Sequence, residues 1–174
     1  SLIFNGEIYN YIELREVLKS LGHHFKSDSD TEVILNGYKE WGFEIVTKLS
    51  GMYSFALFDS FKDILFFARD KIGEKPFYYF FDDSGDIYFS SEFRSLYECG
   101  LLFKKLKKEV DQESMRWYFA FKSTPLDNSI HPKIKKLPQG CYMIIDLKTK
   151  KSEIINYYKI KNNVKKHTLN EPEI

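Results

Sequence analysis

The sequence predicts an α+β domain in which helices cover layers of antiparallel sheet, and two observations carry this prediction. Two helical segments come first, over residues 10–21 and 29–41, and each places apolar residues at the spacing of one buried helix face. Apolar, β-prone runs follow at residues 52–59, 64–69, 77–81 and 87–90. Because strands that are apolar on both faces must be covered on both, we expect helices or a second sheet on each side.

The first strand is short and leads directly into a helix. We expect the strand to span Leu2–Phe4 and to end at Asn5-Gly6. Asn10 is a favourable N-cap, and Glu13 three residues later completes a capping-box pattern. The buried stripe of this helix comprises Leu14, Val17, Leu18 and Leu21.

A second capping box, Ser29-Asp30-Thr31-Glu32, starts the next helix, which ends at Gly42. Its apolar side comprises Val33, Ile34, Tyr38 and Trp41. A third, shorter helix is expected over residues 43–49, immediately before the first of the apolar strands.

The second half of the chain mixes turns, short helices and a hairpin. Residues 70–76, with their Gly and Pro, predict a turn, and residues 93–98 predict a short helix closed by Gly100. Asp111 caps a further helix with the apolar residues Met115, Trp117, Tyr118 and Phe119. A last hairpin pairs residues 142–147 with residues 154–158. We therefore expect one domain over residues 1–160 and a polar linker or tail over residues 161–174.

Composition excludes several classes of protein. The 174 residues include 16 Phe and 12 Tyr, which argues against intrinsic disorder, and the net charge of +1 gives no sign of a nucleic-acid partner. One basic run, Lys104, Lys105, Lys107 and Lys108, is interpreted as a solvated linker. No stretch approaches the ~20 apolar residues of a membrane span, so we expect no membrane partner.

The cysteines and histidines predict no metal site. Cys99 and Cys141 lack metal-ligand spacing, and a reduced, cytoplasmic protein fits them best. The four histidines have no zinc-type partners at short spacing. The chain begins inside an apolar strand with no signal peptide, and we therefore expect it to be a fragment.

Polar residues at the end of the first strand are the main candidates for chemistry. An Asn5 amide and a Gly6 backbone N–H that point the same way could stabilise an oxyanion, although a plain Asn-Gly turn is the simpler interpretation. Asp28 and Asp30 precede a helix and could serve only as caps. Glu7 and one of these aspartates could instead converge on a ligand ammonium, and spacing alone leaves both interpretations open.

Six further segments are read together, in chain order. They are Asn5-Gly6-Glu7-Ile8-Tyr9-Asn10, Ser29 to Leu35, Leu49 to Ala56, Ala68 to Pro76, Ser91-Glu92 and Leu137-Pro138-Gln139-Gly140. They resemble the motifs of class II glutamine amidotransferases, and in particular those of glutamine-hydrolysing asparagine synthetases, with Gln139 in place of the second Pro of the family turn. The resemblance covers roughly residues 2 to 160, which makes the signal far stronger than any one motif.

The resemblance implies a fold and a mechanism. The fold is the four-layer αββα sandwich of N-terminal-nucleophile hydrolases, here incomplete at the N-terminus. An N-terminal Cys attacks the side-chain amide of glutamine, with its own α-amine as base, and the resulting thioester releases ammonia and then glutamate. By position, Asn5 and Gly6 would form the oxyanion hole, while Glu7 and Asp30 would bind the substrate ammonium.

The departures from the family pattern are equally specific. The nucleophilic Cys and the Arg that would bind the substrate carboxylate are absent, and neither Cys99 nor Cys141 carries a free α-amine. Ser1 lies ~13 Å from Asn5 at strand rise, too far to act at an oxyanion hole there. We therefore expect the chain alone to have no glutaminase activity.

The partners and cofactors implied by the resemblance lie largely outside this chain. No cofactor is expected here, whereas ATP and Mg²⁺ are expected in a separate synthetase domain that amidates aspartate. Three alternatives stay open: an acceptor that is a sugar or peptide, a non-catalytic module that binds a partner, and a homodimer formed through exposed sheet edges.

Overall fold

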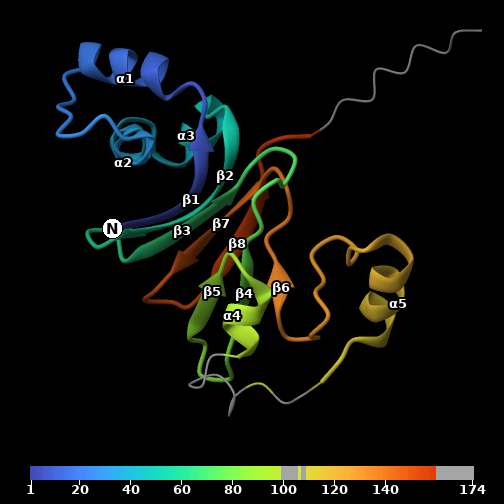
Figure 1. Cartoon of the computed structure of the whole chain (residues 1–174). Helices are drawn as coiled ribbons and strands as arrows, with labels where there is room; N and C mark the ends of the chain where they lie inside the picture. The colour runs from blue at the N-terminus through green and yellow to red at the C-terminus, as the bar shows by residue number, and fades with distance from the viewer. Residues whose placement is uncertain (99–105, 107–108, 160–174) are drawn as a thin grey trace, which may run out of the picture.

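The computed structural model describes residues 1–98, 106 and 109–159, which form helices and two antiparallel sheets (Figure 1). The helices are α1 (Tyr11–Ser20), α2 (Asp30–Trp41), the 3₁₀ helix η1 (Gly42–Glu44), α3 (Ile45–Lys48), α4 (Phe93–Tyr97) and α5 (Gln112–Phe121). The strands are β1 (Leu2–Ile8), β2 (Gly51–Asp59), β3 (Ile64–Arg69), β4 (Tyr78–Phe81), β5 (Ile87–Ser90), β6 (Lys135–Lys136), β7 (Cys141–Asp146) and β8 (Ser152–Asn156).

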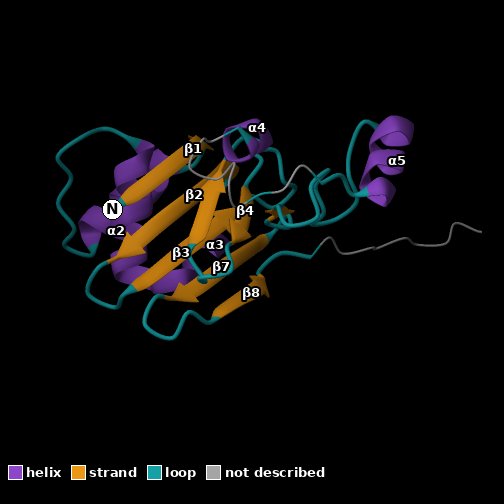
Figure 2. Cartoon of the chain, turned by 90° about the horizontal axis from the view of Figure 1, so that it is seen from below, coloured by secondary structure: helices purple, strands orange, loops and turns teal. Residues whose placement is uncertain are grey.

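The larger sheet has five strands in the order β1-β2-β3-β7-β8, so that β1 and β8 form its two edges (Figure 2). The smaller sheet has the order β5-β4-β6. The two sheets pack face to face on a shared core that includes Phe67, Phe77 and Met143. All the pairings between named strands are antiparallel.

The outer face of the larger sheet is covered by α2, η1 and α3. Neighbouring residues of one strand divide between the two faces: Phe66 packs toward the helices and Phe67 toward the second sheet. The helices contribute Ile34, Tyr38 and Ile45 to the first core. This alternation explains why the strands read as apolar on both faces.

The outer face of the smaller sheet is covered by α4. Phe80 of β4 and Leu96 of α4 belong to a third core, whereas Tyr79 faces the space between the sheets. The layers therefore run helix, sheet, sheet, helix, with a single short helix as the fourth layer. This order confirms the four-layer sandwich of antiparallel sheets that the family resemblance implies.

The start of the chain departs from the prediction in two respects. The first strand does not end at Asn5-Gly6; it runs to Ile8, because the whole segment pairs with β2. Asn10 stands at the N-cap of α1, but its side chain makes no cap hydrogen bond. Its Nδ2 donates to the Lys48 carbonyl and its Oδ1 accepts from the Ser50 amide, both at 2.9 Å. These long-range partners override the local capping box.

The predicted buried stripe of α1 is also only partly correct. Leu18 is fully buried, but Val17 and Leu21 are about half exposed. The helix instead buries Arg15, which donates to Asp28 at 2.9 Å and lies over the ring of Tyr11. Helix α1 packs mainly against α2, and Leu14 reaches the core below it, so only part of the predicted stripe is covered.

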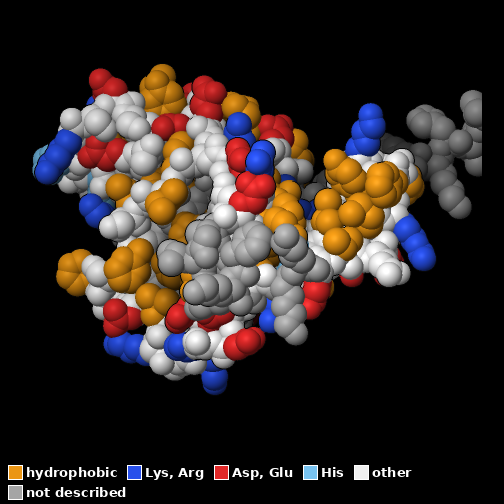
Figure 3. All heavy atoms as spheres, turned by 60° about the horizontal axis from the view of Figure 1, so that its bottom comes forward, with side chains coloured by type: hydrophobic (Ala, Val, Ile, Leu, Met, Phe, Trp, Pro, Cys, Tyr) orange, Lys and Arg blue, Asp and Glu red, His pale blue; other side chains and the backbone are white. Residues whose placement is uncertain are grey.

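Helix α5 begins where the sequence predicts, since the Asp111 carboxylate accepts a hydrogen bond from the Ser114 amide at 2.7 Å. Its large side chains are nevertheless exposed: Phe119 by 79% and Phe121 by 66%. Figure 1 shows α5 standing apart from the two sheets, and Figure 3 shows apolar side chains gathered on it. Ser114 is the residue of α5 that is fully buried.

Several predictions fall on residues that the structure does not describe. These are the interpretations of Cys99, Gly100 and the lysine run at 104–108, and the linker at residues 161–174. Among the described residues, no helix combines the length and apolar character that crossing a membrane requires.

Candidate functional site

Strand β1 places its polar residues along an open edge of the larger sheet. Ser1 and Phe58 exchange backbone hydrogen bonds, and the Tyr9 amide donates to the Ser50 carbonyl at 2.7 Å. Hydrogen-bonded and non-hydrogen-bonded pairs alternate along an antiparallel pair of strands. The backbone N–H and C=O groups of odd-numbered β1 residues therefore bond to β2, and those of even-numbered residues point away from β2. The backbone N–H of Gly6 therefore points to the open edge of the sheet.

The Asn5 side chain enters a groove between the two sheets. Asn5 pairs with Ser54 of β2 in the register, and both line a cavity of about 230 Å³. The remaining walls are Ile3, Phe55, Ala56, Phe77, Phe89, Ser90 and Ser91. A carboxamide next to the outward N–H of Gly6 thus lies at the mouth of a largely apolar groove.

Gly6 is required by the close approach of two strands. Its φ of +151° falls in a region that other residues rarely adopt, and a Cβ there would lie 2.1 Å from the Met52 carbonyl oxygen. Gly51 meets Glu7 in the same way from the opposite strand. Gly6 therefore lies at a point of tight strand pairing and not in the turn expected from Asn-Gly.

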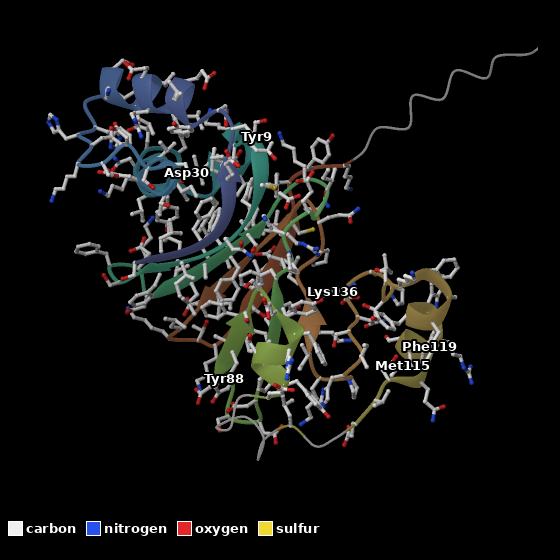
Figure 4. All side chains as sticks on the ribbon, viewed as in Figure 1. Tyr9, Asp30, Tyr88, Met115, Phe119 and Lys136 are labelled. Atoms are coloured by element: carbon white, nitrogen blue, oxygen red, sulfur yellow. The ribbon has the colours of Figure 1, made fainter. Side chains whose placement is uncertain are left out.

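Asp30 lies at the same edge, at the first turn of α2. The Ile8 amide, which faces outward like that of Gly6, donates to Asp30 Oδ2 at 3.1 Å. Ser29 caps the helix as predicted, accepting from the Thr31 amide at 3.1 Å. Figure 4 shows Asp30 beside the end of β1 that leads to Tyr9. The second capping-box partner, Glu32, accepts instead from the amides of Lys26 and Ser27.

Negative charge gathers at this end of β1. The side chain of Glu7 is exposed, and Glu7 immediately precedes Ile8, whose amide donates to Asp30. Partial burial, followed by the charges of Glu74 and Glu7, raises the pKa of Tyr9 above its usual range. Such a surface favours a cationic group, which is the condition for binding an ammonium.

Asp28 does not join this edge. Its carboxylate is fully exposed and pairs with Arg15 at 2.9 Å. Of the two aspartates that the sequence left open, the structure therefore brings only Asp30 to β1.

Asp70 is a buried carboxylate at the start of residues 70–76, for which the sequence predicts only a turn. It is fully buried and accepts hydrogen bonds from five backbone amides, at 2.6 to 3.2 Å. The donors are the amides of Tyr53, Ile72, Gly73, Glu74 and Lys75. The Arg-Asp pair before the Gly-Pro turn was the signal available in the sequence.

Arg69 fixes the same loop from the other side. Its guanidinium donates to the carbonyls of Gly73, Lys75 and Leu137 at 2.7 to 2.8 Å. The Ser54 hydroxyl donates to the Pro76 carbonyl at 3.0 Å. The loop over residues 70–76 therefore contacts Ser54, the residue that pairs with Asn5 across β1 and β2.

The described thiol lies away from this edge. Cys141 is buried in β7, three strands from β1, which is roughly 14 Å at sheet spacing. No group of three His, Cys, Asp or Glu that could hold a metal ion occurs among the residues that the structure describes.

Comparisons with known proteins agree with the sequence motifs. A family model described as a glutamine amidotransferase domain matches residues 1–167. The chain is 39% identical over 144 residues to glutamine-hydrolyzing asparagine synthetase 1 of Bacillus subtilis, covering 83% of this chain and 22% of that protein. It is 37% identical over 157 residues to a putative asparagine synthetase of Methanocaldococcus jannaschii, covering 90% of this chain and 29% of that protein. The chain thus spans less than a third of the length of these relatives.

Two solved structures share the fold. One is the glutamine phosphoribosylpyrophosphate amidotransferase of B. subtilis, with a TM-score of 0.58, which covers 91% of this chain and 29% of that one. The other is described as the allosteric regulatory enzyme of purine biosynthesis, with a TM-score of 0.59, and covers 92% and 29%. Both are 19% identical to this chain, so the likeness concerns the fold alone.

Proposed function

Because this chain belongs to the family of glutamine amidotransferase domains, we propose that the open edge of β1 forms part of a site that hydrolyses the side-chain amide of glutamine. The observation that carries the proposal is the meeting of three groups at one edge. These are the Asn5 carboxamide, the outward Gly6 N–H and the Asp30 carboxylate bonded to the Ile8 amide.

In this proposal, Asn5 and Gly6 stabilise the oxyanion of the tetrahedral intermediate. A side-chain N–H and a backbone N–H from consecutive residues can converge on one oxygen, and the backbone N–H is already in place because β1 pairs with β2 along its length. The close approach of β1 and β2 that glycine permits at position 6 supports this role, since the tight pairing keeps the N–H at a fixed place.

Glu7 and Asp30 bind the α-ammonium of the substrate in this proposal. An ammonium has three donors and suits two carboxylates. Asp30 uses one oxygen for the Ile8 amide, which orients the carboxylate and leaves further acceptor capacity. The neighbouring charge of Glu74, felt by Tyr9, adds to the attraction for a cation.

The nucleophile comes from outside these 174 residues in this proposal. Attack on the glutamine amide forms a thioester and releases ammonia, and water then releases glutamate and regenerates the thiol. Cys141 is buried three strands from Asn5, and Ser1 pairs with Phe58, four register positions from the Asn5–Ser54 pair. The chain alone is therefore expected to release no ammonia from glutamine.

The use of the ammonia is a further part of the proposal. The relatives named above are asparagine synthetases, which supports the ATP-dependent amidation of aspartate by a region absent from this chain. Another acceptor, such as a sugar or a peptide, would require no change at the β1 edge. A non-catalytic module would retain the fold but would not need the free polar groups at that edge.

The proposal is tested by glutaminase assays of a protein that joins this chain to a nucleophile-bearing segment. Asn5→Ala should lower kcat by about 10²–10³ with little change in KM, because it removes an oxyanion donor. Asp30→Asn should mainly raise KM. Asp28→Asn is the matched control and should change neither. Equal effects of the Asp28 and Asp30 substitutions would contradict the assigned ammonium site, and steady ammonia release by the chain alone would contradict the need for an external nucleophile.

A further inference from the structure

A second cavity lies between residues 123–127, which follow α5, and the loops that contain Gly73 and Pro138. Its volume is about 640 Å³. The residues that line it are Arg69, Gly73, Ser123, Thr124, Leu126, Asp127, Lys136, Pro138 and Gln139. Figure 4 shows Lys136 on β6, the edge strand of the smaller sheet, on the side toward α5. The proposed glutaminase site does not include this cavity.

Two cations face this cavity without an ion-pair partner. Within the described residues, neither Arg69 nor Lys136 forms a salt bridge, although Asp127 also lines the cavity. Burial first, and then the charge of Arg69, lowers the pKa of Lys136, whereas Asp127 acts in the opposite direction. Burial likewise lowers the pKa of Arg69. The cavity lining thus contains two partly desolvated positive charges and one carboxylate, that of Asp127. Asp70 also acts on Arg69, but its carboxylate is occupied by five backbone amides.

Neutral oxygens hold both cations in place. Lys136 Nζ donates to the Thr124 carbonyl at 2.9 Å, and Arg69 donates to three carbonyls of the neighbouring loops. These bonds fix the direction of each group but supply no negative charge. An ammonium has three donors, so Lys136 retains capacity toward the cavity, where Ser123 and Gln139 add polar side chains.

We propose that the cavity between Arg69, Lys136 and Thr124 binds a small oxyanion, either a carboxylate or a phosphate. An anion there would offset the repulsion between the two cations and accept the remaining hydrogen bonds of Lys136. The cavity admits a small molecule, and the partial burial of Arg69 and Lys136 gives the interaction a lower dielectric than an exposed lysine would offer.

The test is an NMR titration of the ¹⁵N-labelled chain at constant ionic strength, with inorganic phosphate in one arm and sodium acetate in the other. We expect at least one probe to bind with a Kd of about 1 mM and to shift the amides of Gly73 and Thr124. The arm that binds more tightly identifies the source of the anion. Lack of saturable binding in both arms at about 50 mM would overturn the proposal.

Lys136→Gln should weaken binding by about tenfold or more. The matched control is Lys135→Gln, since Lys135 is the preceding residue and its Nζ instead donates to Asn128 Oδ1 at 2.7 Å. Equal weakening by the two substitutions would show only a general effect of charge and would overturn the site. Thermal unfolding of Lys136→Gln and of Lys136→Met shows whether each variant is folded, which separates lost binding from lost folding. A folded variant of either kind that binds the anion as tightly as the wild type would overturn the proposal.

Discussion

Asp70 and Asp30 are two carboxylates that meet the backbone of the same sheet and do so in opposite ways. Asp70 is fully buried and accepts five amide hydrogen bonds, so no acceptor capacity is left for a ligand. Asp30 accepts one backbone amide, that of Ile8, and stays partly exposed at an open edge. The difference separates a carboxylate that stabilises a loop from one that keeps acceptor capacity for the substrate ammonium we propose.

The same contrast holds for the groups around each carboxylate. Around Asp70, Arg69 satisfies three loop carbonyls and the chain closes on itself. Along the strand edge that Asp30 joins, the N–H of Gly6 points to the open edge of the sheet, and Asn5 lines a groove between the sheets. The Gly6 N–H and the Asn5 side chain, which have no hydrogen-bond partner among the described residues, thus lie at the edge where the family resemblance places the chemistry.

The largest expected effect comes from Asp70→Asn. A neutral amide offers one acceptor oxygen and turns an NH₂ group toward backbone donors, so several buried N–H groups lose their partner. We expect the free energy of unfolding to fall by about 3–5 kcal/mol, measured by urea denaturation. Asp30→Asn is the control, with an expected loss of about 1 kcal/mol or less. Similar losses for both variants would contradict the distinction between the two carboxylates.

Gly6→Ala should follow in size. The new Cβ would lie 2.1 Å from the Met52 carbonyl oxygen, so β1 must separate from β2. We expect a loss of about 2–4 kcal/mol in thermal or urea unfolding. Gly22→Ala is matched in having a positive φ, of +92°, but meets nothing within 4 Å, and should cost about 1 kcal/mol. A Gly6 variant as stable as the Gly22 variant would show that β1 is not tightly held.

Asp111 offers a smaller, pH-dependent effect at an exposed helix end. The Ser114 amide donates to its carboxylate and holds the pKa of Asp111 below its usual range. A lowered folded-state pKa means that the cap contributes fully above the unfolded value of about 3.9 and is lost as the pH falls through the folded value. The Ser114 amide shift should therefore titrate below about pH 4 in the wild type. In Asp111→Asn this titration should disappear; its persistence would assign the shift to another group.

The smallest expected effect on stability is that of Asn5→Ala. Asn5 is exposed, and none of the side-chain hydrogen bonds within the described residues includes it, so the change should stay within about 0.5 kcal/mol. Asn36→Ala provides the contrast, because Asn36 is buried and donates to the His24 carbonyl at 3.3 Å. Equal losses for the two substitutions would indicate that Asn5 stabilises the fold rather than serving a ligand.

Local signals in the sequence predicted those features that depend on neighbours along the chain. The caps at Ser29 and Asp111, the strands over residues 52–69 and the layered architecture were predicted correctly. The end of β1 was not, because its extent depends on pairing with β2, more than 40 residues away in sequence.

The failures elsewhere have the same origin. Asn10 exchanges a local cap for contacts with Lys48 and Ser50, and the full burial of Asp70 depends on a loop that folds back over it. The exposed aromatic side chains of α5 show the converse, since an apolar pattern does not by itself supply a surface to bury it. Motif order, by contrast, indicated both Asn5 and Asp30, which the structure brings to one strand edge.

The most direct test of the site at the β1 edge is titration of the ¹⁵N-labelled chain with L-glutamine, followed through the backbone amides. Saturable shifts centred on Gly6 and Ile8, lost in Asp30→Asn and kept in Asp28→Asn, are the result we predict. Shifts confined to another surface, or an identical response from the two aspartate variants, would contradict the account.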